Sequence, residues 1–479
     1  MEEKRMKKKH HTPSCFLSLA VRLTVFCLAA GSVCFMQVEE ARAFAVVQTK
    51  LSDAQMAKDY TKELVEGDAG FLEKQYLYTD ELKAALEKSG GLAGVQKSLA
   101  GLGGCRSISE PLTGQAGIYT TYSVPCIFAF AKLNLLISVD PEGRIAGIVT
   151  VPYQEAEETA GEKEDTVKEE TAQKKERSLA VPVADYENGQ LPGTLTLPEG
   201  DGPFPALLLV HGSGPNDRDE SLGLNAPFRD LAEGLAERGI AVYRYDKRTF
   251  VYGSEMAGDI DGTLYEETIE DAVTAVNVLA QQEEIDPDRI FILGHSLGGM
   301  AIPAIDASLE EESLQAAGFI FLAGPARGLD ELMREQLEFL SSLDQAGDNQ
   351  EEQDAQLQEM FAQLDRLKDL DELAPEENIL GAYKAYWSAM DDYHPVEEAG
   401  RIEVPCLVLQ GEEDYQVTME DFDLWHAAYG EKENWQFISY PGLTHLFMQG
   451  KKEDGALAYV AEQKVDEQVI SDIAAFITE

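Results

Sequence analysis

The residue with the clearest chemical potential is Ser296. It is the centre of the sequence GHSLGG at residues 294–299. The apolar run Ile290–Leu293 before it is typical of a strand, and Met300–Ile305 after it has a helical pattern. A serine at a sharp turn from strand to helix exposes its hydroxyl, which can attack a carbonyl once a base takes its proton. The pattern therefore predicts a nucleophile at Ser296, with an ordinary glycine-rich turn as the alternative.

Two backbone N–H groups are candidates to stabilise the negative charge that such an attack creates. The sequence HGSGP at residues 211–215 follows the apolar run Ala206–Val210, and its glycines let the chain pass close to a reacting carbonyl. We expect the N–H groups of Ser213 and Leu297 to form the oxyanion hole, the latter at the positive end of a helix. His211 is interpreted as a structural residue that fixes this loop.

The base and the acid are expected later in the chain. His445 lies in a loop after the last predicted strand and before a terminal helix, which suits a general base. Asp414 comes just past a strand and three residues after a glycine, so it is the predicted acid that orients the imidazole. Glu412 and Glu413 are the competing acids.

Other histidines have different interpretations. His295 adjoins the serine, but we expect its side chain to point elsewhere. His426 lies inside a helical pattern, where a solvated or packed side chain is expected. His394, which precedes a proline, is the alternative base.

The segment 179–479 alternates strands with helices, which predicts βαβ units and a mostly parallel sheet with helices on both faces. Each predicted member of the triad and of the oxyanion hole follows a strand, and sheets of this class place their sites at the carboxyl ends of the strands. The six expected strands are Ala206–Val210, Ile240–Tyr245, Ile290–Leu293, Gly318–Ala323, Cys406–Leu409 and Trp435–Tyr440.

An insertion over residues 328–398 is expected to form a helical cap. Apolar residues recur there at intervals of three and four, on both sides of the polar stretch Gln345–Gln353. A cap over the strand ends would wall an acyl pocket. The alternative is that its apolar faces pack on each other.

The N-terminal part is predicted to contain a targeting signal followed by a small domain. Residues 1–43 combine basic residues, the uncharged apolar run Leu23–Met36 and an A-x-A cleavage site, which predicts a signal peptide. The expected location is therefore secreted or extracytoplasmic, or membrane-tethered if the signal is not cleaved. No stable membrane insertion is expected after cleavage.

Residues 44–153 have helical patterns followed by β-rich runs, which predicts a small α+β domain. The strands Leu133–Val139 and Ile145–Val151, separated by a turn sequence, are expected to form a hairpin. Residues 154–178 contain almost nothing apolar and are predicted to be an acidic linker. Cys105 and Cys126 are expected either to pair or to be buried thiols.

Composition excludes several classes of function. The chain carries 39 Lys and Arg against 87 Asp and Glu, for a formal net charge of −48. Such an acid excess argues against a nucleic-acid binder and against docking on anionic lipid. With 44% apolar residues the chain can still build cores, so the acidity is not a sign of global disorder.

Taken together, these sequences resemble the α/β-hydrolase superfamily over residues 179–479. Strand-HGSG, strand-GHSLGG, strand-GxxD and loop-H occur in the family's order of serine, acid and histidine. The run YRYDKR at residues 243–248 is also similar to the lysophospholipase-like and serine-aminopeptidase-like esterases. With its first domain, which looks like the NTF2-like type, the chain resembles secreted bacterial carboxylesterases.

The resemblance implies a serine hydrolase that cleaves carboxylic esters of short or medium acyl chains. Ser296, His445 and Asp414 would form the triad, with Ser213 and Leu297 at the oxyanion hole and no metal or cofactor required. The expected partner is a small-molecule ester. The alternatives are a thioesterase or aminopeptidase-like hydrolase with the same triad, and a non-enzymatic binding module with a relic site.

Overall fold

The computed structural model describes residues 50–478, except for residues 68, 80–81, 84–85, 87–90, 101, 103, 117–118, 129–131, 153–174, 187, 344–349 and 460. The predicted signal peptide and most of the predicted linker lie outside the described residues.

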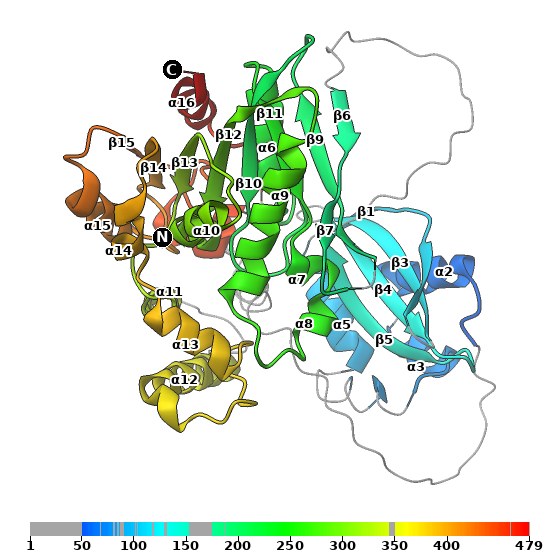
Figure 1. The fold of residues 1–479 in the computed structure, drawn as a ribbon. Coiled ribbons are helices and arrows are strands. Elements are labelled where there is room, and N and C mark those ends of the chain that lie inside the picture. The colour runs from blue at the N-terminus through cyan, green and yellow to red at the C-terminus, as the bar shows by residue number, and fades with distance from the viewer. Residues whose placement is uncertain are drawn as a thin grey trace, which may run out of the picture.

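The first domain consists of helices packed on an antiparallel sheet (Figure 1). Its core joins apolar residues from both layers. The β4–β5 pair is the expected hairpin, and the Asp140 carboxylate closes its turn by accepting the Arg144 N–H at 2.8 Å. The elements are α2 (Ala54–Glu66), α3 (Ala69–Gln75), α5 (Gly91–Ala100), β1 (Cys105–Ile108), β2 (Leu112–Ala116), β3 (Tyr119–Phe128), β4 (Lys132–Val139) and β5 (Ile145–Pro152).

Cys105 and Cys126 lie on the paired strands β1 and β3, and both are free thiols. Of the two expected outcomes, the structure therefore has thiols, although Cys105 is only partly buried. Burial raises the pKa of the Cys126 thiol to about 12, so this group stays protonated at neutral pH.

The second sheet has eight strands in the order β15-β14-β13-β12-β10-β11-β9-β6. The strands from β15 to β11 are parallel, whereas β9 and β6 are antiparallel to their neighbours. All six expected strands are present. The strands are β6 (Lys175–Ser178), β9 (Gly193–Leu197), β10 (Phe204–Val210), β11 (Ala241–Tyr245), β12 (Ile285–His295), β13 (Gly318–Leu322), β14 (Cys406–Gly411) and β15 (Trp435–Tyr440).

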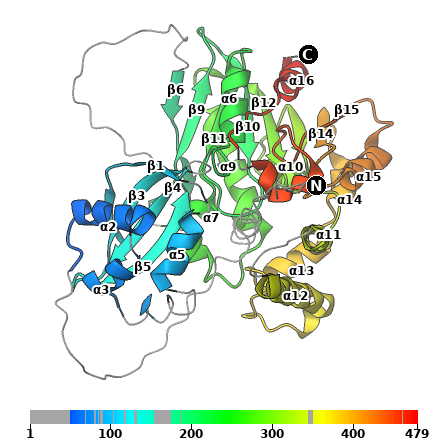
Figure 2. The ribbon, with the colours of Figure 1, turned by 180° about the vertical axis from the view of Figure 1, so that it is seen from behind.

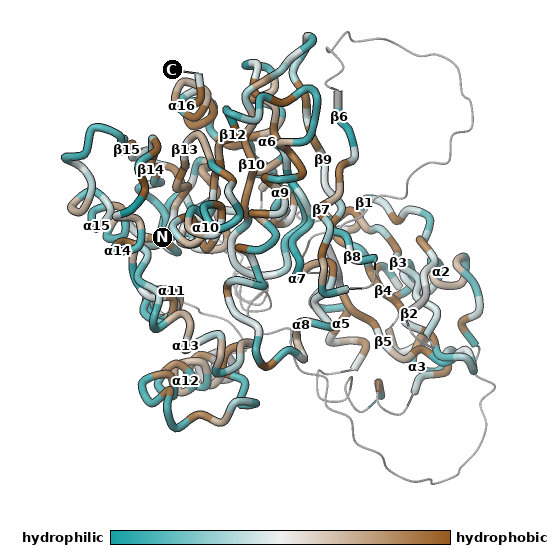
Figure 3. Tube along the Cα trace, in the orientation of Figure 1, coloured by the Kyte–Doolittle hydropathy of each residue, from teal (hydrophilic) through white to brown (hydrophobic). Residues whose placement is uncertain are grey.

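Helices cover both faces of this sheet, as expected (Figure 2). One face packs against α9 (Glu270–Ala280), α10 (Leu297–Glu311) and α15 (Met419–Tyr429). The other packs against α6 (Pro227–Ala236) and α16 (Glu467–Thr478). The hydrophobic residues gather in the central strands between these two layers (Figure 3), because such strands are buried on both sides.

The end of the predicted linker is a strand instead. Residues 175–178 form β6, which pairs with β9 at the edge of the sheet. Long-range contacts override the local polarity here: Glu176 accepts a hydrogen bond from the buried Arg244 at 3.0 Å, and Arg177 bonds Gln282 at 3.0 Å. After β6 the chain forms a small separate hairpin of β7 (Val181–Val183) and β8 (Gly189–Leu191). The short helices α7 (Arg248–Val251) and α8 (Gly253–Met256) come after β11.

The predicted cap is a set of helices between β13 and β14. Its apolar residues form a core of their own, with Met333, Leu364 and Trp387 among its buried members. Most of its apolar faces thus pack on each other, which was the alternative expectation. The helices are α11 (Leu329–Ser342), α12 (Gln350–Arg366), α13 (Lys384–Asp392) and α14 (Pro395–Glu398).

No helix in the described part of the chain is long and apolar enough to span a membrane.

We predict that the buried cation Arg248 is required for stability. Its guanidinium lies 2.6 Å from the buried Asp271 carboxylate and 2.9 Å from Asp185. Arg248→Met leaves Asp271 as a buried charge without its main partner, which should lower the free energy of unfolding by about 3–5 kcal/mol. Urea denaturation measures this. Arg366→Met, which breaks the surface pair between the exposed Arg366 and the half-buried Glu377, is the matched control and should barely move the midpoint.

Candidate active site

Ser296 lies in a tight turn between β12 and α10. Its backbone has φ of 52° and ψ of −119°, a strained conformation for a residue with a side chain. The turn has no room for larger neighbours: a Cβ on Gly294 would be 2.2 Å from the Gly298 carbonyl oxygen, and one on Gly298 would be 2.4 Å from the Val210 oxygen. The glycines of the GHSLGG sequence are thus needed for this bend.

His445 and Asp414 are brought together by the loops after β15 and β14. His445 Nδ1 lies 2.6 Å from Asp414 Oδ2, and both residues are buried. The other carboxylate oxygen accepts the N–H groups of Gln416 at 2.7 Å and Val417 at 3.0 Å. Because its remaining acceptor sites are occupied, the carboxylate is held in one orientation toward the imidazole.

The competing acids have other partners. Glu412 accepts the hydroxyl of Ser439 at 2.8 Å, and Glu413 accepts the Lys452 N–H at 2.9 Å. The alternative base His394 is exposed at the start of α14, and His426 is exposed on α15, where its ring packs edge-on against Phe437. None of the four is hydrogen-bonded into the His445–Asp414 pair.

The loop of His445 lies beside the turn of Ser296. The contact runs through His295, whose Nε2 is 3.1 Å from the His445 carbonyl oxygen and whose ring centroid is 4.6 Å from that of His445. The geometry therefore gathers the hydroxyl-bearing turn and the imidazole from positions about 150 residues apart.

The loop after β10 passes directly by the same turn. A Cβ on Gly212 would lie 3.1 Å from Ser296 Cβ, so the Gly212–Ser213 segment borders the serine. Leu297 is the first residue of α10, where N–H groups have no acceptor within their own helix. Both expected oxyanion donors thus belong to segments in contact with the serine's turn.

His211, at the start of that loop, is buried against aromatic rings. Its ring centroid lies 5.0 Å from that of Phe228 and 5.5 Å from that of Tyr245. Burial lowers its pKa to about 4, so the ring is neutral at pH 7. This packing agrees with a structural role.

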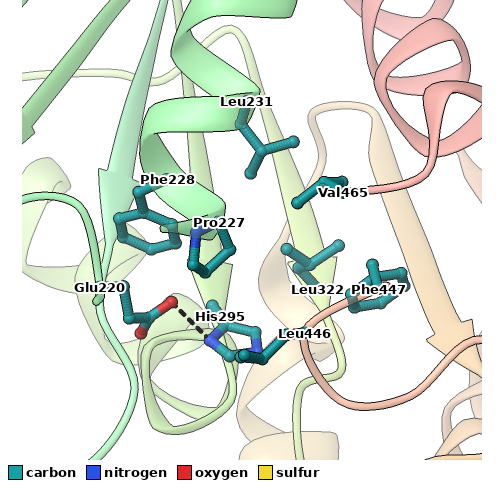
Figure 4. Close-up of a pocket in the computed structure, with 9 residues that line it drawn as sticks. All are labelled: Glu220, Pro227, Phe228, Leu231, His295, Leu322, Leu446, Phe447 and Val465. Atoms are coloured by element: carbon teal, nitrogen blue, oxygen red, sulfur yellow. Dashed lines mark ion pairs between the residues drawn. The ribbon is translucent and has the colours of Figure 1, made fainter. Parts of the chain in front are cut away.

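Sequence reasoning missed Glu220, which connects two parts of the site. Its Oε1 accepts the Gly212 N–H at 2.7 Å, and its Oε2 lies 2.8 Å from His295 Nδ1 (Figure 4). His295 does point away from the serine, but it joins Glu220 to the His445 loop. Glu220 lies in the loop after the HGSGP sequence, and nothing in the sequence around it marks it as the partner of a histidine 75 residues later. A small pocket adjoins the pair, lined by Glu220, Pro227, Phe228, Leu231, His295, Leu322, Leu446, Phe447 and Val465.

The two buried groups favour each other's charged forms. Burial alone would lower the pKa of His295, but the charge of Glu220 raises it above its usual value. Burial likewise acts to raise the pKa of Glu220, yet His295 and the Gly212 N–H lower it overall. The pair is therefore an ion pair at moderately acidic pH.

No cluster of three or more His, Cys, Asp or Glu side chains in the described ranges could hold a metal ion.

Comparisons with known proteins agree with the fold. A model described as "Alpha/beta hydrolase family" matches residues 207–460. Esterase EstD of Thermotoga maritima is 36% identical over 359 residues, which are 75% of this chain and 80% of that protein. An uncharacterized 31.7 kDa protein of Escherichia coli is 26% identical over 253 residues, covering 50% of this chain and 84% of its own.

Two solved structures are similar at low identity. Est1E from Butyrivibrio proteoclasticus aligns with a TM-score of 0.40 at 16% identity, over 63% of this chain and 99% of its own. A puromycin-hydrolyzing peptidase of Mycobacterium tuberculosis aligns with a TM-score of 0.42 at 17% identity, over 76% of this chain. This chain spans 46% of that peptidase, which is less than half of its length.

We predict that Gly298→Ala disrupts the turn. The added methyl would meet the carbonyl oxygens of Val210 at 2.4 Å and His211 at 2.7 Å, and backbone cannot yield as a side chain can. We expect a loss of about 1–3 kcal/mol or more in the free energy of unfolding, measured by urea denaturation. Gly253→Ala is the control, because the added methyl would meet no atom of the described residues within 4 Å. Equal stability of the two variants would contradict the close packing of the turn.

The Glu220–His295 pair predicts a pH-dependent stability. The pKa of His295 is higher in the folded protein than in the unfolded chain. The contribution of His295 to the free energy of unfolding is therefore complete below the unfolded pKa of about 6.5, and it is lost as the pH rises through the folded pKa. The pKa of Glu220 is lower in the folded protein than in the unfolded chain. The contribution of Glu220 to the free energy of unfolding is therefore present above the unfolded pKa of about 4.3, and it is lost as the pH falls through the folded pKa.

Glu220→Gln should therefore lower the urea midpoint more at about pH 5.5 than at about pH 9. Glu412→Gln, the same change at a surface carboxylate, should show no such difference between the two pH values. A Glu220→Gln effect that is equal at both pH values would refute the ion pair.

Proposed function

The chain belongs to the alpha/beta hydrolase family and is an esterase-like hydrolase, and from this premise we propose that it cleaves carboxylic esters of short or medium acyl chains with Ser296, His445 and Asp414 as its triad. The observation that carries the proposal is the 2.6 Å contact between His445 Nδ1 and the buried Asp414 carboxylate, beside the strained turn of Ser296.

The mechanism follows from the chemistry of these groups. His445 Nε2 takes the hydroxyl proton as Ser296 Oγ bonds to the acyl carbon, and Asp414 stabilises the resulting imidazolium. The carbonyl oxygen becomes an oxyanion, which accepts the N–H groups of Ser213 and Leu297. His445 then gives its proton to the departing alcohol, and the C–O bond breaks to leave an acyl-enzyme. Water, deprotonated by His445, releases the acid and restores the serine.

The proposed preference for short or medium acyl chains is supported by the packing of the cap. Its helices bury most of their apolar residues against each other, so we expect few of them to line a pocket for a long chain. A thioesterase and an aminopeptidase-like hydrolase would use the same three groups. The net charge of −48 works against polyanionic thioesters of coenzyme A.

We also propose roles for the N-terminal segment and the first domain. Residues 1–43 act as an export signal, so the enzyme works outside the cytoplasm, or tethered to the membrane if the signal is retained. The first domain is of the NTF2-like type, with helices preceding an antiparallel sheet.

Hydrolysis of p-nitrophenyl esters from acetate to palmitate tests this function. We expect the highest kcat/KM at short or medium chain length, and little turnover of an aminoacyl anilide or an acyl thioester. Ser296→Ala should abolish turnover and labelling by a fluorophosphonate, because the nucleophile is gone. Asp414→Asn should lower kcat by about 10⁴-fold through the wrong imidazole tautomer.

Glu413→Gln is the matched control for the acid, since Glu413 bonds the Lys452 N–H instead of the imidazole. It should leave kcat close to that of the native protein. Labelling that survives Ser296→Ala would overturn the nucleophile, and a folded protein inactive on every ester would favour the relic binding module.

A further inference from the structure

Lys247 is a buried cation next to the loop that borders the serine. It follows β11, is 2% exposed, and donates from Nζ to the Gly212 carbonyl oxygen at 2.8 Å. Its backbone N–H also donates to the Asn216 carbonyl at 3.0 Å, so the loop is held at two points. The mechanism above uses no charge at this position.

The bond to the carbonyl constrains the next N–H group. Gly212 C=O and Ser213 N–H belong to one peptide unit, which is planar and trans, so the two groups point in opposite directions. A cation fixed on the carbonyl side therefore fixes the direction of the Ser213 N–H on the other side. A charge-assisted hydrogen bond at the carbonyl also polarises the peptide, which makes its N–H a stronger donor.

The loop is held by opposite charges on its two sides. The Gly212 N–H, which belongs to the preceding peptide unit, donates to the buried Glu220 at 2.7 Å, whereas the Gly212 carbonyl faces Lys247. The Asn216 amide adds a weaker contact to the same carbonyl at 3.2 Å. Rotation of the Gly212–Ser213 peptide would break the contacts of the Gly212 carbonyl with Lys247 and Asn216, and it would take this acceptor away from the buried ammonium.

Lys247 is itself held by a carboxylate that reaches the cap. Its Nζ lies 2.5 Å from Glu267 Oε1, and Glu267 Oε2 accepts the hydroxyl of Tyr386 on α13 at 2.8 Å. Burial, together with the charge of Glu267, raises the pKa of Tyr386, so its hydroxyl stays a neutral donor. The contacts therefore run from the cap through Glu267 and Lys247 to the peptide beside Ser296.

We propose that Lys247 is a positioning residue for the oxyanion hole: by binding the Gly212 carbonyl, it holds the Ser213 N–H toward the oxygen that becomes charged during ester hydrolysis. The proposal rests on the function proposed above. It assigns Lys247 no contact with the substrate, and Glu267 and Tyr386 keep its ammonium in place.

The test compares an ester with its thionoester, in which sulfur replaces the carbonyl oxygen. Sulfur accepts hydrogen bonds poorly, so the advantage of the ester depends on the oxyanion donors. Lys247→Met should lower kcat for p-nitrophenyl butyrate by about 10²–10³-fold, the usual effect of losing one such donor, and leave KM within about threefold. The ratio of kcat for ester over thionoester should fall at least about tenfold.

Lys464→Met is the matched control. It removes a largely exposed ammonium that lies 2.6 Å from the buried Asp230 carboxylate on α6. Its ratio of ester to thionoester turnover should equal that of the native protein. A merely structural role for Lys247 would lower turnover of both substrates equally, and that result would overturn the proposal.

If Lys247→Met does not fold, Lys247→Gln decides, because its shorter neutral amide cannot span Gly212 and Glu267. A lower ratio supports the proposal, and an unchanged ratio overturns it. Ser296→Ala distinguishes a failure of the proposed function from a failure of the role of Lys247. Turnover that survives in Ser296→Ala refutes the proposed function, whereas an inactive Ser296→Ala with an unchanged ratio in the lysine variant refutes only the role of Lys247.

Discussion

The lack of space around the turn at Ser296 is the constraint on which the rest of the site depends. Gly298 lies against the end of β10, and a Cβ on Gly299 would lie 2.7 Å from Gly324 Cα, just past β13. Because β10 and β13 flank β12 in the sheet, the turn is wedged between the ends of its two neighbours. Such a wedge exists only where adjacent parallel strands end at the same edge. The strained backbone persists because the surrounding chain leaves it no other path.

Buried charged side chains fix the loop at Gly212, which lies beside this turn. Glu220 and Lys247 lie on the two sides of Gly212, and each is balanced by a further charged group, His295 and Glu267 respectively. Buried ion pairs contribute little net stability, because removing the charges from water offsets most of their attraction. Their effect here is on conformation: rotation of the loop would take the Gly212 N–H away from the Glu220 carboxylate and the Gly212 carbonyl oxygen away from the Lys247 ammonium, and both charged groups are buried.

Much of this structure is predictable from local sequence. The six central strands, the helix after Ser296 and the placement of Asp414 and His445 after strands all follow from apolar periodicity and glycine positions. The roles of Glu220 and Lys247 do not, because each acts on Gly212 from a different element, and their residue types are those of ordinary surface charges. The strand at residues 175–178 was missed for the same reason, since its polar residues gain their partners only from distant segments.

The position of β6 has a consequence for association between copies of the chain. Without it, β9 would present a row of free N–H and C=O groups, which is a template for intermolecular strand pairing and fibril growth. The edge of the sheet is now β6, which carries Lys175, Glu176 and Arg177 in succession. Charged side chains on an edge strand discourage pairing with a strand of another molecule. A proteolytic cut after Ser178 would release this protective strand together with the first domain. A cut between residues 154 and 174 would instead leave β6 attached to the hydrolase, so the exposed edge of the sheet would stay covered.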